Sequence, residues 1–166
     1  MDTAKNFKGF TLIELLVGIT VTSIVFTVGY AGFREFSRRQ ALTGVTKMVV
    51  ADLRQIQQLA LTGQKPTGGV SCLKLIGYSF VRTGASVYEL RANCDNTLIT
   101  GSPILTSPVI KTTNLNGVTF TATTASTMFK VLGQGTNLNA VNSLTFTHTA
   151  TNTNAIITIG TGGEVQ

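Results

Sequence analysis

A long apolar stretch near the N-terminus constrains this 166-residue chain more than any other feature. Residues 10–33 have the sequence FTLIELLVGITVTSIVFTVGYAGF, with Glu14 as the only charge and no proline. As a helix this stretch would reach roughly 36 Å at about 1.5 Å per residue, which is enough to cross a bilayer. A core helix of a soluble protein is shorter or has a polar face. We therefore expect a membrane-inserted helix joined to a soluble domain.

A cleaved secretory signal is the first alternative, because Gly29-Tyr30-Ala31 has the small-x-small pattern of a cleavage site. The length of the apolar run and the carboxylate near its start are not typical of such signals. A plain single-pass anchored protein, or a secreted protein cut after Ala31, stays open on composition alone. Basic residues flank the stretch on both sides, and a simple count of them slightly favours a cytoplasmic C-terminus.

Glu14 needs a physical explanation, because an acidic residue near the centre of a membrane helix costs about 2.5–3.5 kcal/mol and less near its end. In one interpretation the side chain lies at the interface and reaches out to water. In the other it meets a cation inside an assembly. A carboxylate within a membrane segment is a functional candidate by default.

The residues around the start of the stretch form an ordered motif, KGFTLIELLV at residues 8–17. It combines a short basic leader, Gly9, Phe10, a glutamate four residues later and an apolar run. This pattern resembles the processing site of type IV prepilins and type II secretion pseudopilins. The resemblance implies that a membrane-embedded prepilin peptidase cuts between Gly9 and Phe10 and N-methylates the new amine of Phe10. A glycine at the cut also leaves the backbone unshielded for a protease.

The resemblance also gives Glu14 a cation. In these families the glutamate compensates the N-terminal amine of Phe10 on a neighbouring subunit, and pairing relieves two charges that are each costly in hydrocarbon. It further implies a cytoplasmic leader and an external C-terminal domain, against the simple charge count. The expected partners are homologous pilin or pseudopilin subunits, the prepilin peptidase and the membrane, with the subunit ending in a cell-surface or periplasmic filament.

The helical pattern continues beyond the membrane segment to about residue 62, where Gly63 and Pro66 provide a stop signal. Apolar residues recur every three to four positions and predict one buried stripe, with basic residues on much of the other face. The stripe comprises Phe33, Phe36, Leu42, Val45, Val49, Leu53, Ile56 and Leu59. The alternative is two helices broken near Gly29, Gly32 or Gly44, because glycine costs about 1 kcal/mol in a helix interior.

The remaining residues indicate β-structure, so the expected fold class is α+β: a helical spine packed on a C-terminal antiparallel sheet domain. Gly84-Ala85 and Asn116-Gly117 are expected as two-residue hairpin turns. The predicted strands are residues 75–83, 86–92, 109–115, 118–123, 127–132, 144–148 and 155–159. The expected organisation is a leader at 1–9, a membrane half of the helix at 10–33, an amphipathic half at 34–63 and a β-rich domain at 64–166.

The chain has two cysteines, Cys72 and Cys94. If Gly84-Ala85 is the hairpin turn, Leu75 pairs opposite Cys94 and Cys72 lies just beyond. Outside the membrane a disulfide is chemically favoured. Two buried free thiols are the alternative.

The sequence contains few residues that could support catalysis or metal binding. Two cysteines and the single histidine, His148, do not supply four metal ligands, and His148 has no nucleophile or acid partner by spacing. We expect no enzyme, metal or cofactor, and instead a structural pilin or pseudopilin subunit.

A weaker, second resemblance concerns the subclass. Residues 51–64 and the C-terminal residues 157–165 resemble H-type pseudopilins and FimT-like minor pilins. FimT-like members bind DNA, and the net charge of +6 invites that alternative. However, residues 67–166 carry five basic and three acidic side chains, a net charge of only +2, and the C-terminal residues 160–166 contain no arginine. Nucleic-acid binding is therefore an alternative that the sequence does not favour.

Overall fold

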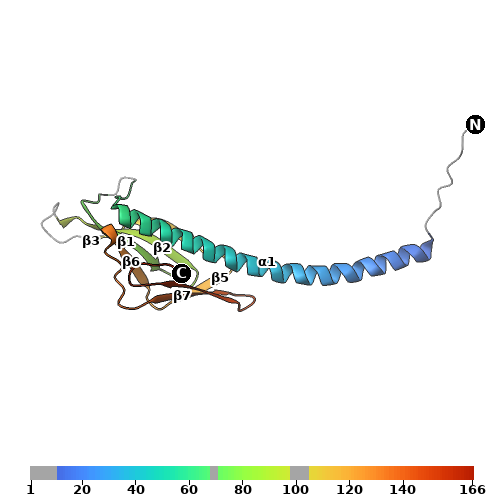
Figure 1. Cartoon of the computed structure of the whole chain (residues 1–166). Helices are drawn as coiled ribbons and strands as arrows, with labels where there is room; N and C mark the ends of the chain where they lie inside the picture. Colours follow the sequence, from blue (N-terminus) through green and yellow to red (C-terminus); the bar gives the residue numbers. More distant parts are fainter. Residues whose placement is uncertain (1–10, 68–70, 98–104) are drawn as a thin grey trace, which may run out of the picture. The chain divides into compact units, whose positions relative to one another are not determined.

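The computed structural model describes residues 11–67, 71–97 and 105–166. It contains one long helix, α1 (Leu12–Thr62), followed by two antiparallel β-sheets (Figure 1). This confirms the predicted α+β class. The chain divides into two compact units, Met1–Arg38 and Arg39–Gln166, which we call the N-terminal and C-terminal units. Each is described separately.

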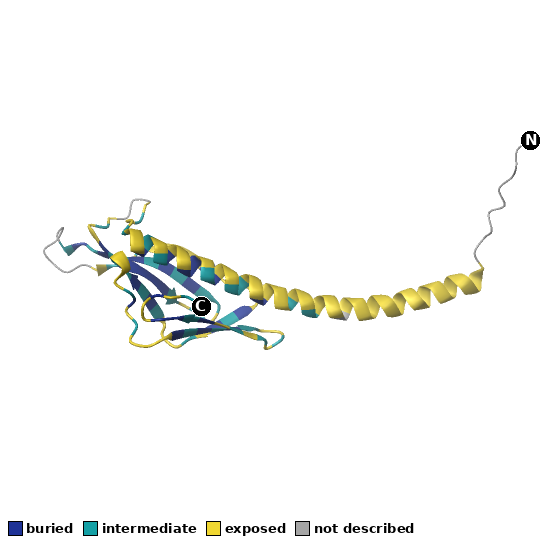
Figure 2. Cartoon of the chain, viewed as in Figure 1, coloured by how far each residue is buried: buried dark blue, intermediate teal, exposed yellow. Residues whose placement is uncertain are grey.

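The N-terminal unit consists, in its described part, of the first half of α1. Its apolar side chains are exposed on every side of the helix (Figure 2). Phe33 and Phe36 are 68% and 61% exposed. The prediction that these two residues belong to the buried stripe is therefore wrong, because both lie in the part of α1 whose apolar side chains are exposed.

The C-terminal unit holds the second half of α1 and both sheets. The first sheet has the order β3-β2-β1-β6, with β4 also pairing with β2, and the second has the order β5-β7-β8. The strands of the first sheet are β1 (Lys74–Arg82), β2 (Val87–Asp95), β3 (Leu105–Thr106), β4 (Val109–Asn114) and β6 (Ser126–Lys130). Those of the second are β5 (Val118–Ala122), β7 (Asn142–His148) and β8 (Asn154–Ile159), and a short 3-10 turn, η1 (Val131–Gly133), follows β6.

All seven predicted strands are present, while the two-residue β3 and the turn η1 were not predicted. The alternation of apolar and polar residues explains this result, since β2 has buried residues at every second position. A strand as short as β3 has no such pattern to detect.

The core forms where the second half of α1 meets the two sheets (Figure 2). The predicted stripe contributes Leu42, Val49, Leu53 and Ile56 as buried residues. Four aromatic rings connect the sheets, with Phe80 and Tyr88 from the first and Phe120 and Phe146 from the second. The ring centroids of neighbours in this cluster are 4.9–6.3 Å apart, within the range in which aromatic rings attract.

Helix α1 ends at the predicted stop. Gly63 has φ +63°, a left-handed conformation that glycine adopts without strain from a Cβ atom. Its amide donates a hydrogen bond to the carbonyl of Ala60, and the amide of Gln64 donates to the carbonyl of Leu59. These two bonds form a Schellman motif, which satisfies carbonyls that the end of a helix leaves free.

Neither Gly84-Ala85 nor Asn116-Gly117 forms the predicted two-residue hairpin turn. Residues 83–86 connect β1 to β2, and the amides of Thr83 and Gly84 both donate to the carbonyl of Val87. Asn116-Gly117 forms a tight turn, with Gly117 at φ +76°, but it joins β4 of one sheet to β5 of the other. Turn chemistry predicted the change of chain direction correctly, whereas the pairing partner was set by distant residues.

Candidate functional site

The predicted processing site lies at the start of the chain. Gly9 and Phe10 fall outside the described residues, which begin at Thr11. The hydroxyl of Thr11 accepts a hydrogen bond from the amide of Glu14 at 3.3 Å, and its carbonyl accepts one from the amide of Leu15. Thr11 therefore caps α1, in the Thr-x-x-Glu spacing of a capping box.

This cap places Glu14 in the first turn of α1, at the positive end of the helix dipole. The neighbouring side chains Leu12, Ile13 and Leu15 are apolar and exposed. The carboxylate is thus surrounded by a surface suited to hydrocarbon, where an unpaired charge is costly. The local geometry explains why a helix starts here, and the side chain of Glu14 is exposed.

The first half of α1 is long and apolar enough to cross a membrane. Its polar side chains are compatible with lipid, because they donate hydrogen bonds to carbonyls of the preceding turn. The pairs are Thr20 with Val17, Thr22 with Gly18, Ser23 with Ile19 and Thr27 with Ser23. These features fit a membrane-anchored protein.

The two cysteines are joined in the structure as a Cys72–Cys94 disulfide, with Cα atoms 5.2 Å apart. Leu75 lies opposite Cys94, as the two-residue turn predicted, but for a different reason. The longer turn shifts the register by one residue, and a β-bulge between Leu75 and Gly77 shifts it back. The backbone of β6 passes so close to Gly77 that a Cβ atom there would lie 2.2 Å from the carbonyl oxygen of Phe129.

A buried polar cluster on α1 was missed at the sequence level. Asp52 is buried and accepts hydrogen bonds at 2.7 Å from the hydroxyl of Tyr88 on β2 and at 2.8 Å from the ammonium of Lys111 on β4. Burial, followed by the hydrogen bond to Asp52, raises the pKa of Tyr88 well above its ordinary value. Asp52 lies three residues after Val49, so its place beside the apolar stripe was the available signal.

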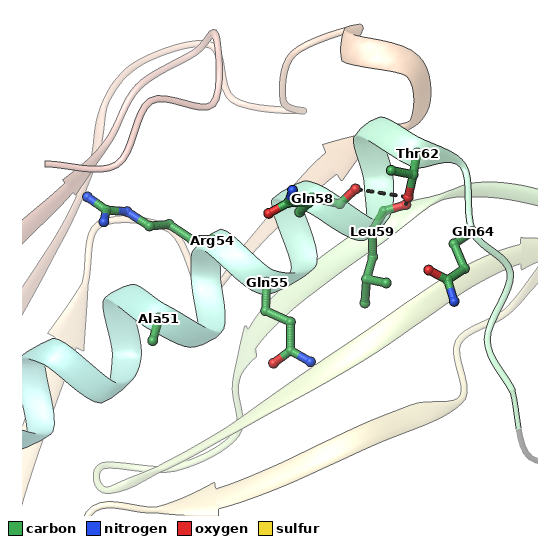
Figure 3. A pocket seen from close by; sticks show the side chains of 7 residues that line it. All are labelled: Ala51, Arg54, Gln55, Gln58, Leu59, Thr62 and Gln64. Carbon is green, nitrogen blue, oxygen red and sulfur yellow. Dashed lines mark hydrogen bonds between the residues drawn. The ribbon is translucent and has the colours of Figure 1, made fainter.

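The outer side of the same helical segment has an open hollow of about 410 Å³. It is lined by Ala51, Arg54, Gln55, Gln58, Leu59, Thr62 and Gln64. Figure 3 shows Gln55 and Leu59 extending from the same side of α1, and the hydroxyl of Thr62 donating to the carbonyl of Gln58 at 3.0 Å. Amides and one guanidinium can form hydrogen bonds, but the lining offers no pair of groups for acid–base chemistry.

Other chemically active residues lie apart from one another. His148 is at the end of β7, where its Nδ1 accepts a hydrogen bond from the amide of Ala150. Among the described residues, no three His, Cys, Asp or Glu side chains are grouped so that they would hold a metal ion.

Comparison with known proteins gives one match. Residues 4–30 match the family model described as the prokaryotic N-terminal methylation motif, which is the prepilin signal of type IV pilins and pseudopilins. No curated protein and no solved structure matches the chain. The chain therefore carries a prepilin signal that runs directly into its exposed apolar helix. A motif of this type points to a structural protein that is processed by a prepilin peptidase.

Proposed function

We propose that the chain is a structural filament subunit, a pilin or pseudopilin, anchored in the membrane before assembly. The observation that carries this proposal is the continuity between the methylation motif at residues 4–30 and a helix whose apolar side chains are exposed all round. Such a surface needs lipid or other apolar helices to cover it. The partners in the filament are homologous subunits, and the C-terminal unit carries the surface exposed outside the membrane.

In this proposal the peptidase cleaves between Gly9 and Phe10 and methylates the amine of Phe10. Glu14 then accepts the charged amine of Phe10 from the neighbouring subunit. The cap by Thr11 supports this role, because it holds Glu14 in the first helical turn. The leader faces the cytoplasm and the C-terminal unit lies outside, where the Cys72–Cys94 disulfide is stable.

Mass spectrometry of the mature N-terminus tests the processing step. We expect an N-methylated phenylalanine at position 10, formed only in cells with an active peptidase. An intact Met1 would contradict prepilin processing, and a start at Gly32 would instead indicate a secretory signal.

Assembly is tested separately with Glu14→Ala and Glu14→Gln. Both variants should be cleaved normally, because they leave Gly9 and Phe10 unchanged, but they should enter filaments poorly. Normal assembly of Glu14→Ala would argue against the ion pair between subunits.

A further inference from the structure

The edge of the second sheet formed by β8 leaves the backbone groups of Ile156 without a partner among the described residues. The amide of Thr158 donates to the carbonyl of Gln166 at 2.9 Å, and the amide of Gln166 donates back to Thr158 at 3.0 Å. The backbone groups of Thr158 therefore face away from β7. Because this direction alternates along a strand, the amide and carbonyl of Ile156 face the same way. Within the described part of the chain, neither group of Ile156 has a hydrogen-bond partner.

A groove of about 380 Å³ runs between this edge and α1. Its strand side is formed by Ile156, whose side chain is 64% exposed, by the buried Ile157, and by Gln166, which pairs with Thr158. Its helix side includes Ala51, a small residue that leaves space in the groove. The groove thus combines an unpaired strand edge with an apolar wall, which is the arrangement that accepts an added strand.

Two basic side chains, Lys47 and Arg54, line the helix side of the groove. Both residues are exposed, and among the described residues neither forms an ion pair or hydrogen bond. Among the described residues, no acidic side chain lines the groove. The two cations are seven positions apart, so they lie about 10 Å apart along the helix, a length that about three residues of an extended strand span.

We infer that this groove binds an extended acidic segment of another polypeptide, which adds to β8 as a strand. The backbone of the segment would pair with the amide and carbonyl of Ile156. Its carboxylates would meet Lys47 and Arg54, and its apolar side chains would pack on Ile156 and beside Ala51. This binding surface is independent of the proposed filament function, since it belongs wholly to the C-terminal unit.

A polypeptide fits the groove better than a nucleic acid does. A phosphate backbone would satisfy the two cations, but it offers no regular alternation of donors and acceptors to pair with a strand edge. The unpaired amide and carbonyl of Ile156 therefore favour a polypeptide over a nucleic acid.

The test uses the full chain in detergent micelles and a short fluorescent peptide that alternates valine with glutamate. We expect binding that weakens as salt increases. Lys47→Gln and Arg54→Gln should each weaken binding about threefold, and together about tenfold. Lys74→Gln, an exposed lysine on β1 outside the groove, is the matched control and should have no effect.

Ile156→Pro removes the free amide without breaking a bond to β7, and it should weaken binding about tenfold. Ile156→Thr keeps the amide and should weaken binding less. If the proline variant does not fold, Ala51→Phe carries the test, because it fills the groove from an exposed helix position and should abolish binding.

Three results would overturn the inference. The first is equal binding of a peptide with glutamine in place of glutamate. The second is unchanged binding by Ile156→Pro or Ala51→Phe in folded protein. The third is displacement of the peptide by a DNA oligonucleotide that binds the native chain, Ile156→Pro and Ala51→Phe with equal affinity. That result would assign Lys47 and Arg54 to nucleic-acid binding.

Discussion

Replacement of Asp52 tests how the second half of α1 is held on the first sheet. Asp52→Ala removes the acceptor for the hydroxyl of Tyr88, which is fully buried, at a cost of about 1–3 kcal/mol. The loss of the contact to Lys111 adds at most about 1 kcal/mol, because the lysine side chain is 43% exposed and its ammonium can be solvated again. We therefore expect the free energy of unfolding to fall by about 2–3 kcal/mol.

Asp52→Asn is the matched control, since the amide oxygen still accepts the bond from Tyr88 while the charge facing Lys111 is lost. It should cost only about 1 kcal/mol. The assay is urea unfolding of the full chain in detergent, followed by the near-ultraviolet circular dichroism of tyrosine, because the chain has three tyrosines and no tryptophan. Equal losses for the two variants, or a loss below about 0.5 kcal/mol for Asp52→Ala, would refute the assignment of the main cost to the buried hydroxyl.

Three further predictions concern the C-terminal unit. Replacing Cys72 and Cys94 by serine should lower the free energy of unfolding by about 3 kcal/mol, because the disulfide joins residues 22 positions apart. The measurement is urea unfolding without reductant. If the native chain had the same urea midpoint with and without reductant, this prediction would be contradicted. Gly77→Ala should cost more than about 2 kcal/mol, because the new Cβ atom would lie 2.2 Å from a backbone oxygen of β6, whereas Gly84→Ala, with its nearest contact at 3.6 Å, should not show this loss in the same assay. Burial raises the pKa of Tyr88 above its ordinary value of 10.0, so the folded state holds the phenol proton more tightly than the unfolded state. This group should therefore leave stability unchanged below pH 10 and lower it as the pH rises above 10. An unfolding midpoint that increases above pH 10 would contradict this prediction.

Local patterns predicted the elements of this fold well. The spacing of apolar residues predicted one helix at 11–62, and the structure has α1 at Leu12–Thr62. Gly63 predicted its end, because a left-handed residue closes a Schellman motif. These features depend on residues within a few positions of one another, so a sequence pattern contains them.

Sheet pairing depended on distant residues and was predicted less well. Asn116-Gly117 favours a hairpin, yet β5 pairs with β7, so that Val118 lies opposite His148. The aromatic core explains the preference, since this pairing sets Phe120 beside Phe146, with ring centroids 5.3 Å apart. Burial of two large rings outweighs the few tenths of a kcal/mol that turn chemistry contributes.

The candidate sites also differ in whether they depend on local or on distant residues. Glu14 was proposed from the sequence because a carboxylate is conspicuous in an apolar run, and its role stays a prediction. Asp52 was not, because its partner Lys111 lies 59 positions away and an aspartate on an amphipathic helix is ordinary. The hydrogen bonds of Asp52 depend on the register of β4 against β2, which brings Lys111 and Tyr88 to the same side of the helix.

The glycines of α1 are not explained by the fold of a single chain. Gly18, Gly29, Gly32 and Gly44 each cost the helix about 1 kcal/mol relative to alanine. A Cβ atom at any of these positions would meet nothing within 4 Å, so contacts within the chain do not require glycine there. Gly63 and Gly77 differ, because a positive φ and a close backbone demand them. In the proposed filament, a neighbouring helix that approaches closely, or a bend in the helix, would account for glycine at these four positions.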